Sequence, residues 1–304
     1  MCCLFGLIDP QQRLTGKQKT RLLHALATAA EARGTDASGI AFNAGTHLVI
    51  RKAPIPGRRL KTRVRDDTAV IMGHTRMTTQ GDAKFTRNDH PFRGSTPAGS
   101  FALAHNGVLY NDRQLRETLH LPDTNIETDS YVAVQLIERK KALDLSTLKY
   151  MAEQVEGSFS FTVLDGENNL YIVKGDSPLH MLRWPSLGVY IYASTEDILR
   201  AALRMASFSL RGAAKINVAS GEILRIDRHG CLARSEFDDV GTYRRYYSPY
   251  SFDLWWPTPK ASRASHVDEL KAVAYAYGYN PEMIDRLIAL GHTPDEIEEY
   301  LYEI

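Results

Sequence analysis

The feature that most constrains the fold is a succession of short apolar segments between Ser158 and Phe237. Turn residues separate these segments, and one helical pattern, at 195–205, interrupts them. Strands that follow one another without regular strand-helix alternation favour antiparallel sheets over a doubly wound parallel sheet. The sequence therefore predicts an α+β fold in which two mostly antiparallel sheets pack face to face with helices outside, a four-layer αββα sandwich.

Length and composition predict one large domain with an appendage. The chain has 304 residues, 43% of them hydrophobic, which is enough for a large core. We expect a domain over residues 1–240, an aromatic strap or linker over 241–263, and a small helical tail over 264–304. The long turn-rich stretch between Gly81 and Gly99 is expected to be a loop.

The charge and the cysteine content of the chain indicate where the protein is located and which partners it lacks. The net charge of +1 gives no global attraction to nucleic acid, and no apolar stretch approaches the roughly 18 residues needed to cross a bilayer. The chain has three cysteines, and the adjacent Cys2 and Cys3 are poorly placed to pair with each other. We expect a cytoplasmic protein without nucleic-acid or membrane partners.

Position two holds a cysteine, Cys2, at the head of an apolar, strand-like segment. Removal of Met1 would leave Cys2 with a thiol, of ordinary pKa about 8.5, and an α-amine, of pKa about 8, in one residue. The amine can take the proton of the thiol, so nucleophile and base need no histidine or aspartate. The alternative is that Cys2 and Cys3 are both small buried hydrophobes of a first strand.

Polar groups cluster where apolar strands end. His74 to Gly81 follows one strand, His105-Asn106-Gly107 ends another, and Glu127-Thr128-Asp129 opens a helix. Such positions are where an active site built from separate segments is commonly found. His74, His90 and His105 lack the tight spacing of metal ligands, so we expect structural histidines, with no metal and no cofactor.

Five short motifs occur in order along this chain. They are Cys2-Cys3-Leu4-Phe5-Gly6, Arg33-Gly34-Thr35-Asp36-Ala37-Ser38-Gly39-Ile40-Ala41, His74-Thr75-Arg76-Met77-Thr78-Thr79-Gln80-Gly81, His105-Asn106-Gly107 and Glu127-Thr128-Asp129-Ser130. The set resembles the class II glutamine amidotransferases, the N-terminal-nucleophile glutaminase domain found fused in glucosamine-phosphate synthase and asparagine synthetase. That family has Cys-Gly-Ile-Phe-Gly, Arg-Gly-x-Asp-Ser-x-Gly-Ile, His-Thr-Arg-Trp-Ala-Thr-His-Gly, His-Asn-Gly and Glu-Thr-Asp-Thr at the corresponding places. The resemblance covers roughly residues 2–240.

The resemblance implies three catalytic groups. Cys2 would attack the side-chain amide of glutamine and form a thioester, with its α-amine passing the proton to the leaving ammonia. The side chain of Asn106 and the backbone N–H of Gly107 would stabilise the oxyanion. The alternative for Asn106-Gly107 is an ordinary hairpin turn.

The same resemblance implies the substrate-binding groups. Arg76 would hold the α-carboxylate of glutamine, with Thr79 adding a hydroxyl, and Asp129 would hold the ammonium. Met77 and Gln80 belong to this segment but depart from the family, which has Trp and His there. The alternatives are structural roles, in which Arg76 is an arginine in an ion pair and Asp129 is a carboxylate at the start of a helix. Cys3, where the family has glycine, is a second candidate nucleophile, which register disfavours.

These features predict a stand-alone glutamine amidotransferase that releases ammonia for a separate synthase subunit. About 60 residues after the domain are too few for an acceptor domain. Two alternatives remain open: a hydrolase of γ-glutamyl amides without ammonia transfer, and an inactive scaffold that retains the fold.

Overall fold

The computed structural model describes residues 2–82 and 84–238 and, beyond them, residues 267, 270, 271, 274, 280–294, 296, 297 and 300. The predicted aromatic strap, 241–263, lies outside the described residues. In the described residues no helix is long and apolar enough to cross a membrane.

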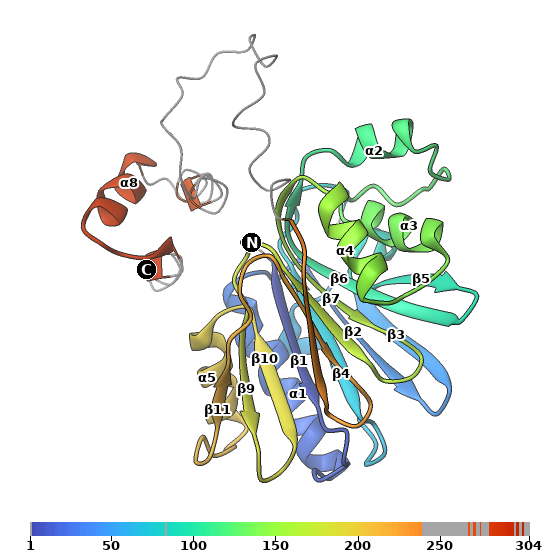
Figure 1. The fold of residues 1–304 in the computed structure, drawn as a ribbon. Coiled ribbons are helices and arrows are strands. Elements are labelled where there is room, and N and C mark those ends of the chain that lie inside the picture. Colours follow the sequence, from blue (N-terminus) through green and yellow to red (C-terminus); the bar gives the residue numbers. More distant parts are fainter. Residues whose placement is uncertain are drawn as a thin grey trace.

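Two antiparallel sheets form the centre of the domain (Figure 1). Within the described residues the first sheet has seven strands in the order β11-β9-β10-β1-β4-β2-β3, and the second has six in the order β13-β12-β8-β7-β6-β5. The strands of the first sheet are β1 (Cys3–Ile8), β2 (Ala37–Ala44), β3 (His47–Ala53), β4 (Val70–Arg76), β9 (His180–Trp184), β10 (Val189–Ala193) and β11 (Ala214–Ile216). Those of the second are β5 (Phe92–Thr96), β6 (Gly99–Leu109), β7 (Gly157–Leu164), β8 (Leu170–Lys174), β12 (Glu222–Ile226) and β13 (Leu232–Glu236).

Helices cover the outer face of each sheet, so the predicted αββα sandwich is confirmed (Figure 1). On the outside of the first sheet lie α1 (Gly16–Ala29) and α5 (Glu196–Met205). On the outside of the second lie α2 (Asp112–Thr118), α3 (Tyr131–Lys140) and α4 (Leu145–Gln154). A third apolar core fills the space between the sheets.

Local sequence explains where the first helix begins. Thr15 caps α1 in a capping box with Gln18, which satisfies two backbone N–H groups that the first turn leaves without partners. Lys19, in the first turn, is fully buried and pairs with Asp9 at 3.0 Å while donating to the carbonyls of Asp66 and Thr68. These contacts fix α1 against the end of β1.

Strand β1 lies in the middle of its sheet, hydrogen-bonded to β10 on one side and β4 on the other. Cys3 and Phe5 belong to the core beneath the outer helices, whereas Leu4 and Ile8 belong to the core between the sheets. Since side chains alternate along a strand, Cys2 continues the face that looks toward the second sheet. The two adjacent cysteines therefore lie in different environments.

The described part of the tail is helical and has its own small core. Helix α8 (Glu282–Ala289) contributes Ile284, which is buried with Leu270, Ala274 and Ile297. Leu290, the first residue after α8, is 76% exposed.

Candidate active site

Cys2 lies directly before β1 and is partly exposed, whereas Cys3 is fully buried. The Cys2 thiol donates to the carbonyl of Met77 at 3.5 Å, which places it beside the loop that follows β4. Burial raises the pKa of this thiol, while the hydrogen bond to Met77 and the positive charges of Arg76 and Arg33 act in the opposite direction. Of the two cysteines, Cys2 is the one that a substrate can reach.

Arg33 connects Cys2 with the second sheet. It follows the short 3₁₀ turn Ala30–Ala32 after α1, and its side chain is only 2% exposed. Its Nε donates to the carbonyl of Cys2 at 2.8 Å, and its Nη2 donates to Oδ1 of Asn106 at 3.4 Å. Sequence reasoning assigned Arg33 no role, although it opens one of the quoted motifs.

Asn106 and Gly107 lie inside β6, so the hairpin-turn alternative for this pair is wrong. The amide nitrogen of Asn106 is buried and has no hydrogen-bond partner among the described residues. Because Arg33 holds the amide oxygen, the unpaired nitrogen is the group left to donate to a substrate. Gly107 has a φ of +132°, and a Cβ there would lie 2.0 Å from the carbonyl of Ser158, so the backbone at this position requires glycine.

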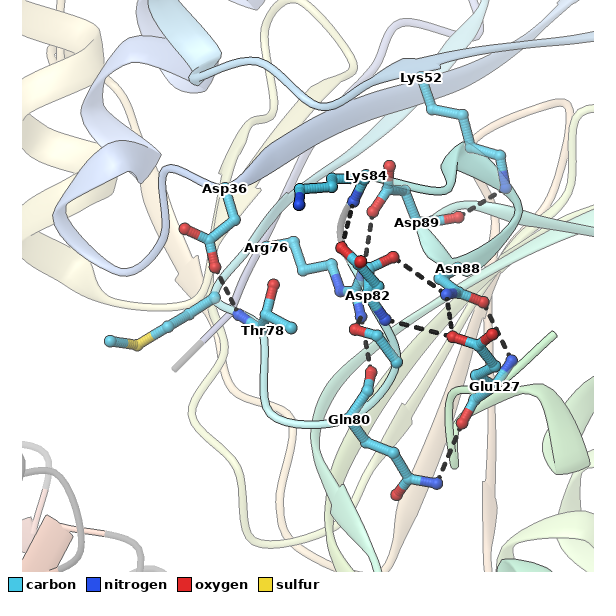
Figure 2. Close-up of polar contacts among 12 residues, drawn as sticks. Asp36, Lys52, Arg76, Thr78, Gln80, Asp82, Lys84, Asn88, Asp89 and Glu127 are labelled. Carbon is cyan, nitrogen blue, oxygen red and sulfur yellow. Dashed lines mark hydrogen bonds and ion pairs between the residues drawn. The ribbon is translucent and has the colours of Figure 1, made fainter.

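Arg76 ends β4 and is held from several directions, as Figure 2 shows. Its Nη1 donates to Oδ1 of Asp89 at 2.8 Å, in an ion pair whose side chains are 3% and 1% exposed. Its Nη2 donates to the carbonyls of Gln80 at 2.6 Å and Gly81 at 2.9 Å. Part of the guanidinium that the resemblance assigns to a substrate carboxylate is thus already bound within the protein.

The segment 77–90 is fastened to Glu127, again visible in Figure 2. The carboxylate of Glu127 accepts from the side chains of Asn88 and Arg87 and from the backbone N–H of Asp82. The side chain of Gln80 donates to the backbone carbonyl of Glu127 at 3.0 Å. These bonds join the segment after β4 to the one that precedes α3.

The remaining predicted substrate groups differ in exposure. Thr79 is exposed, and Met77 is partly buried. Asp129 is 3% exposed, and its Oδ2 accepts from the backbone N–H of Leu109 at 2.6 Å. Burial raises the pKa of Asp129, against the effect of hydrogen bonds from Leu109 and Ser130. The structure thus ties Asp129 to the end of β6, the strand that carries Asn106.

Three buried histidines lie behind the site. The rings of His74 and His90 are 4.3 Å apart and those of His90 and His105 6.4 Å apart, measured between centroids. Nε2 of His74 lies 2.9 Å from the carbonyl of His105, a contact that joins the two sheets. Burial lowers the pKa of His74 and of His105 to about 3. Among the described residues, no group of three or more His, Cys, Asp or Glu is placed to hold a metal ion.

Comparison with known proteins identifies relatives of this chain. A glutamine amidotransferase domain family matches residues 74–201. Glutamine–fructose-6-phosphate aminotransferase (isomerizing) of Bacillus licheniformis is 34% identical over 157 residues, which is 49% of this chain and 26% of that protein. Amidophosphoribosyltransferase of Methanothermobacter thermautotrophicus is 31% identical over 165 residues, covering 52% and 33% respectively. The chain thus spans about a quarter to a third of the length of these curated relatives.

Solved structures share the fold. The glutamine phosphoribosylpyrophosphate amidotransferase of B. subtilis, in complex with ADP and GMP, superposes with a TM-score of 0.59 at 23% identity, covering 78% of this chain and 49% of that one. A structure described as the allosteric regulatory enzyme of purine biosynthesis gives a TM-score of 0.62 at 20% identity, covering 90% and 58%.

Two antiparallel sheets between helical layers, with a cysteine leading into the central strand, define an N-terminal-nucleophile hydrolase fold. Within that class, the matching family and the sequence relatives are glutamine amidotransferases or related amidotransferases. Over residues 74–201 the chain matches a glutamine amidotransferase domain family, and its curated relatives are similar to it over about half of its length.

Proposed function

We propose that Cys2 hydrolyses the side-chain amide of glutamine and that the ammonia released serves a separate synthase. The observation that carries the proposal is the bridge made by Arg33, which holds the carbonyl of Cys2 and the amide oxygen of Asn106 with one side chain. The residue proposed as the nucleophile, and an amide whose nitrogen has no partner among the described residues, thus contact the same guanidinium.

The reaction follows from these groups. The Cys2 thiolate attacks the side-chain amide carbon of glutamine, and the new oxyanion accepts from Nδ2 of Asn106 and the backbone N–H of Gly107. The C–N bond then breaks, and the α-amine of Cys2, which took the thiol proton, gives that proton to the leaving ammonia. Water hydrolyses the thioester, so that one glutamine and one water yield one glutamate and one ammonia.

The released ammonia needs an acceptor. The curated relatives are named as an aminotransferase and a phosphoribosyltransferase, and this chain matches only a fraction of each. Delivery to a separate subunit is therefore our inference for this chain, and hydrolysis of a γ-glutamyl amide without ammonia transfer is its competitor.

The experiment is ammonia release from glutamine by the full chain and two single variants, with mass-spectrometric mapping of the site labelled by diazo-oxo-norleucine. Cys2→Ala should abolish turnover and labelling, while Cys3→Ala, its matched control on the opposite face of β1, should keep both. Activity that survives in Cys2→Ala and disappears in Cys3→Ala would contradict the assignment of the nucleophile.

A further inference from the structure

Asp89 forms an ion pair with Arg76, the arginine that the proposed reaction needs to bind the α-carboxylate of its substrate. Its Oδ1 lies 2.8 Å from Nη1 of Arg76, and the two side chains are almost fully buried. An arginine has five N–H donors, and three of those on Arg76 already point to Asp89, Gln80 and Gly81. Figure 2 shows Arg76 between Asp89 and the loop carbonyls.

A substrate carboxylate at Arg76 has two ways to bind, and Asp89 opposes both. If the substrate shares the guanidinium with Asp89, two carboxylates lie close together in a buried place and repel each other. If it displaces Asp89, a buried carboxylate loses its ion-pair partner. The second oxygen of Asp89, Oδ2, is buried and has no hydrogen-bond partner among the described residues, so it offers no ready replacement for Arg76.

Lys52 does not remove this opposition. Its Nζ donates to the backbone carbonyl of Asp89 at 2.6 Å and lies 5.0 Å from the centre of the Phe92 ring. Burial lowers the pKa of Lys52 to about 8, against the effect of the Asp89 charge. This hydrogen bond goes to the backbone and not to the carboxylate, whose Oδ1 accepts from Arg76.

An uncharged carbonyl meets neither obstacle. An amide oxygen can accept from a remaining N–H of Arg76 without repelling Asp89 and without requiring it to move. We propose that Asp89 is a specificity-determining residue that makes the site favour a glutamine unit whose α-carboxyl group is blocked as an amide over free glutamine. This inference rests on the proposed function, because it assumes that Cys2 attacks a glutamine side chain held by Arg76.

The test compares L-glutamine with L-glutamine α-N-methylamide, which keeps the free amine and the side-chain amide but lacks the α-carboxylate. Ammonia release by the full chain should give a kcat/KM at least about tenfold higher for the methylamide. Asp89→Asn keeps the size of the side chain and an acceptor for Arg76 but removes the charge. It should raise kcat/KM for free glutamine by about tenfold, through KM rather than kcat, and change the methylamide little.

Asp112→Asn is the matched control, because Asp112 pairs with Arg116 at 3.6 Å on α2, outside the proposed site. It should leave the ratio of the two substrates unchanged. The unmodified chain alone already decides the matter if Asp89→Asn fails to fold, since a preference for free glutamine would overturn the inference. An equal effect of Asp89→Asn on both substrates would overturn it as well. Release of ammonia from neither substrate, with no label on Cys2, would remove the proposed function itself and this inference with it.

Discussion

Asn106 has a buried amide nitrogen without a partner among the described residues, and a buried donor left in that state costs free energy unless a ligand uses it. We predict that Asn106→Ala lowers kcat for amide hydrolysis by roughly a factor of 10² to 10³, the usual cost of one oxyanion donor, with a smaller change in KM. Steady-state ammonia release measures both constants.

Asn43→Ala is the control for that variant. Asn43 is also a buried strand asparagine with an unsatisfied atom, but its amide donates to Asp165 and Asn168 in another part of the fold. It should lose stability and keep its kcat. Equal kcat in Asn106→Ala and the unmodified chain would exclude Asn106 from the oxyanion site.

At the residue scale, a sequence proposes functional groups where a short motif carries the chemistry, and it misses contacts between distant residues. Cys2 and Asn106 could be proposed because both lie in short motifs. The role of Arg33 could not, because its contact with Asn106 spans 73 positions and depends on how the turn after α1 meets β6. The pairing of Asp89 with Arg76 could not be predicted either, because it depends on how the loop after β4 folds back, although a structural ion pair was the alternative reading of that arginine.

The loop between β4 and β5 is attached to the rest of the domain by the side chain of Glu127. The Glu127 carboxylate fixes Asp82, Arg87 and Asn88, and Lys84 and Arg87 in the same loop are tryptic sites. We predict that Glu127→Ala speeds trypsin cleavage at Lys84 and Arg87 and raises KM, because the loop that carries Gln80 and holds Arg76 loses its attachment. Timed digestion with mass-spectrometric mapping of the cuts measures the first effect.

Glu117→Ala provides the comparison, since Glu117 is exposed on α2. Its digestion pattern should match that of the unmodified chain. If the two variants are cut at the same rate within 77–90, Glu127 does not hold the loop.

Elements with a strong pattern were predictable, and short edge strands were not. The capped helix α1 and the hairpin of β2 and β3 follow from Thr15 and from the turn at 43–46. Strand β5 falls in the stretch expected to be a loop, and that expectation is wrong. Its sequence, Phe-Arg-Gly-Ser-Thr, has little strand preference of its own, and pairing with β6 creates the strand.

At the scale of the whole molecule, the histidines between the sheets tie stability to pH. The folded pKa of His74 and of His105 is about 3, whereas an unfolded histidine has a pKa of about 6.5. Between these values the unfolded chain binds more protons, so the free energy of unfolding falls as the pH drops below about 6.5, by up to about 1.4 kcal/mol per pH unit for each histidine. Above that pH the contribution is fully present.

Denaturant unfolding at pH values from 7 down to 5 tests this expectation on the unmodified chain and on His90→Phe. Burial also lowers the pKa of His90, and both of its ring nitrogens lack partners among the described residues. His90→Phe should therefore flatten the pH dependence, while His229→Gln, at an exposed position, should not. Buried carboxyls with raised pKa, such as Asp176, act in the opposite sense but are common to all three proteins. Identical slopes would exclude His90 as a contributor.

The layer architecture of the molecule could be predicted, but the order of its strands could not. Apolar segments without helix alternation are enough to indicate two antiparallel sheets. The position of β1 between β10 and β4 depends in part on its pairing with β10, more than 180 positions away, which no local pattern records.

The alternation at the start of β1 gives two neighbouring cysteines opposite surroundings: Cys2 is partly exposed, and Cys3 is sealed beneath the helices of the outer layer. An alkylating reagent added to the native chain should therefore modify Cys2 and the exposed Cys231 early, and Cys3 only after the centre of the sheet has opened. Counting modified thiols over time makes the late phase an internal reporter of unfolding that needs no added dye. The early phase combines Cys2 and Cys231, so mapping the modified sites reports how accessible Cys2 is in the same sample.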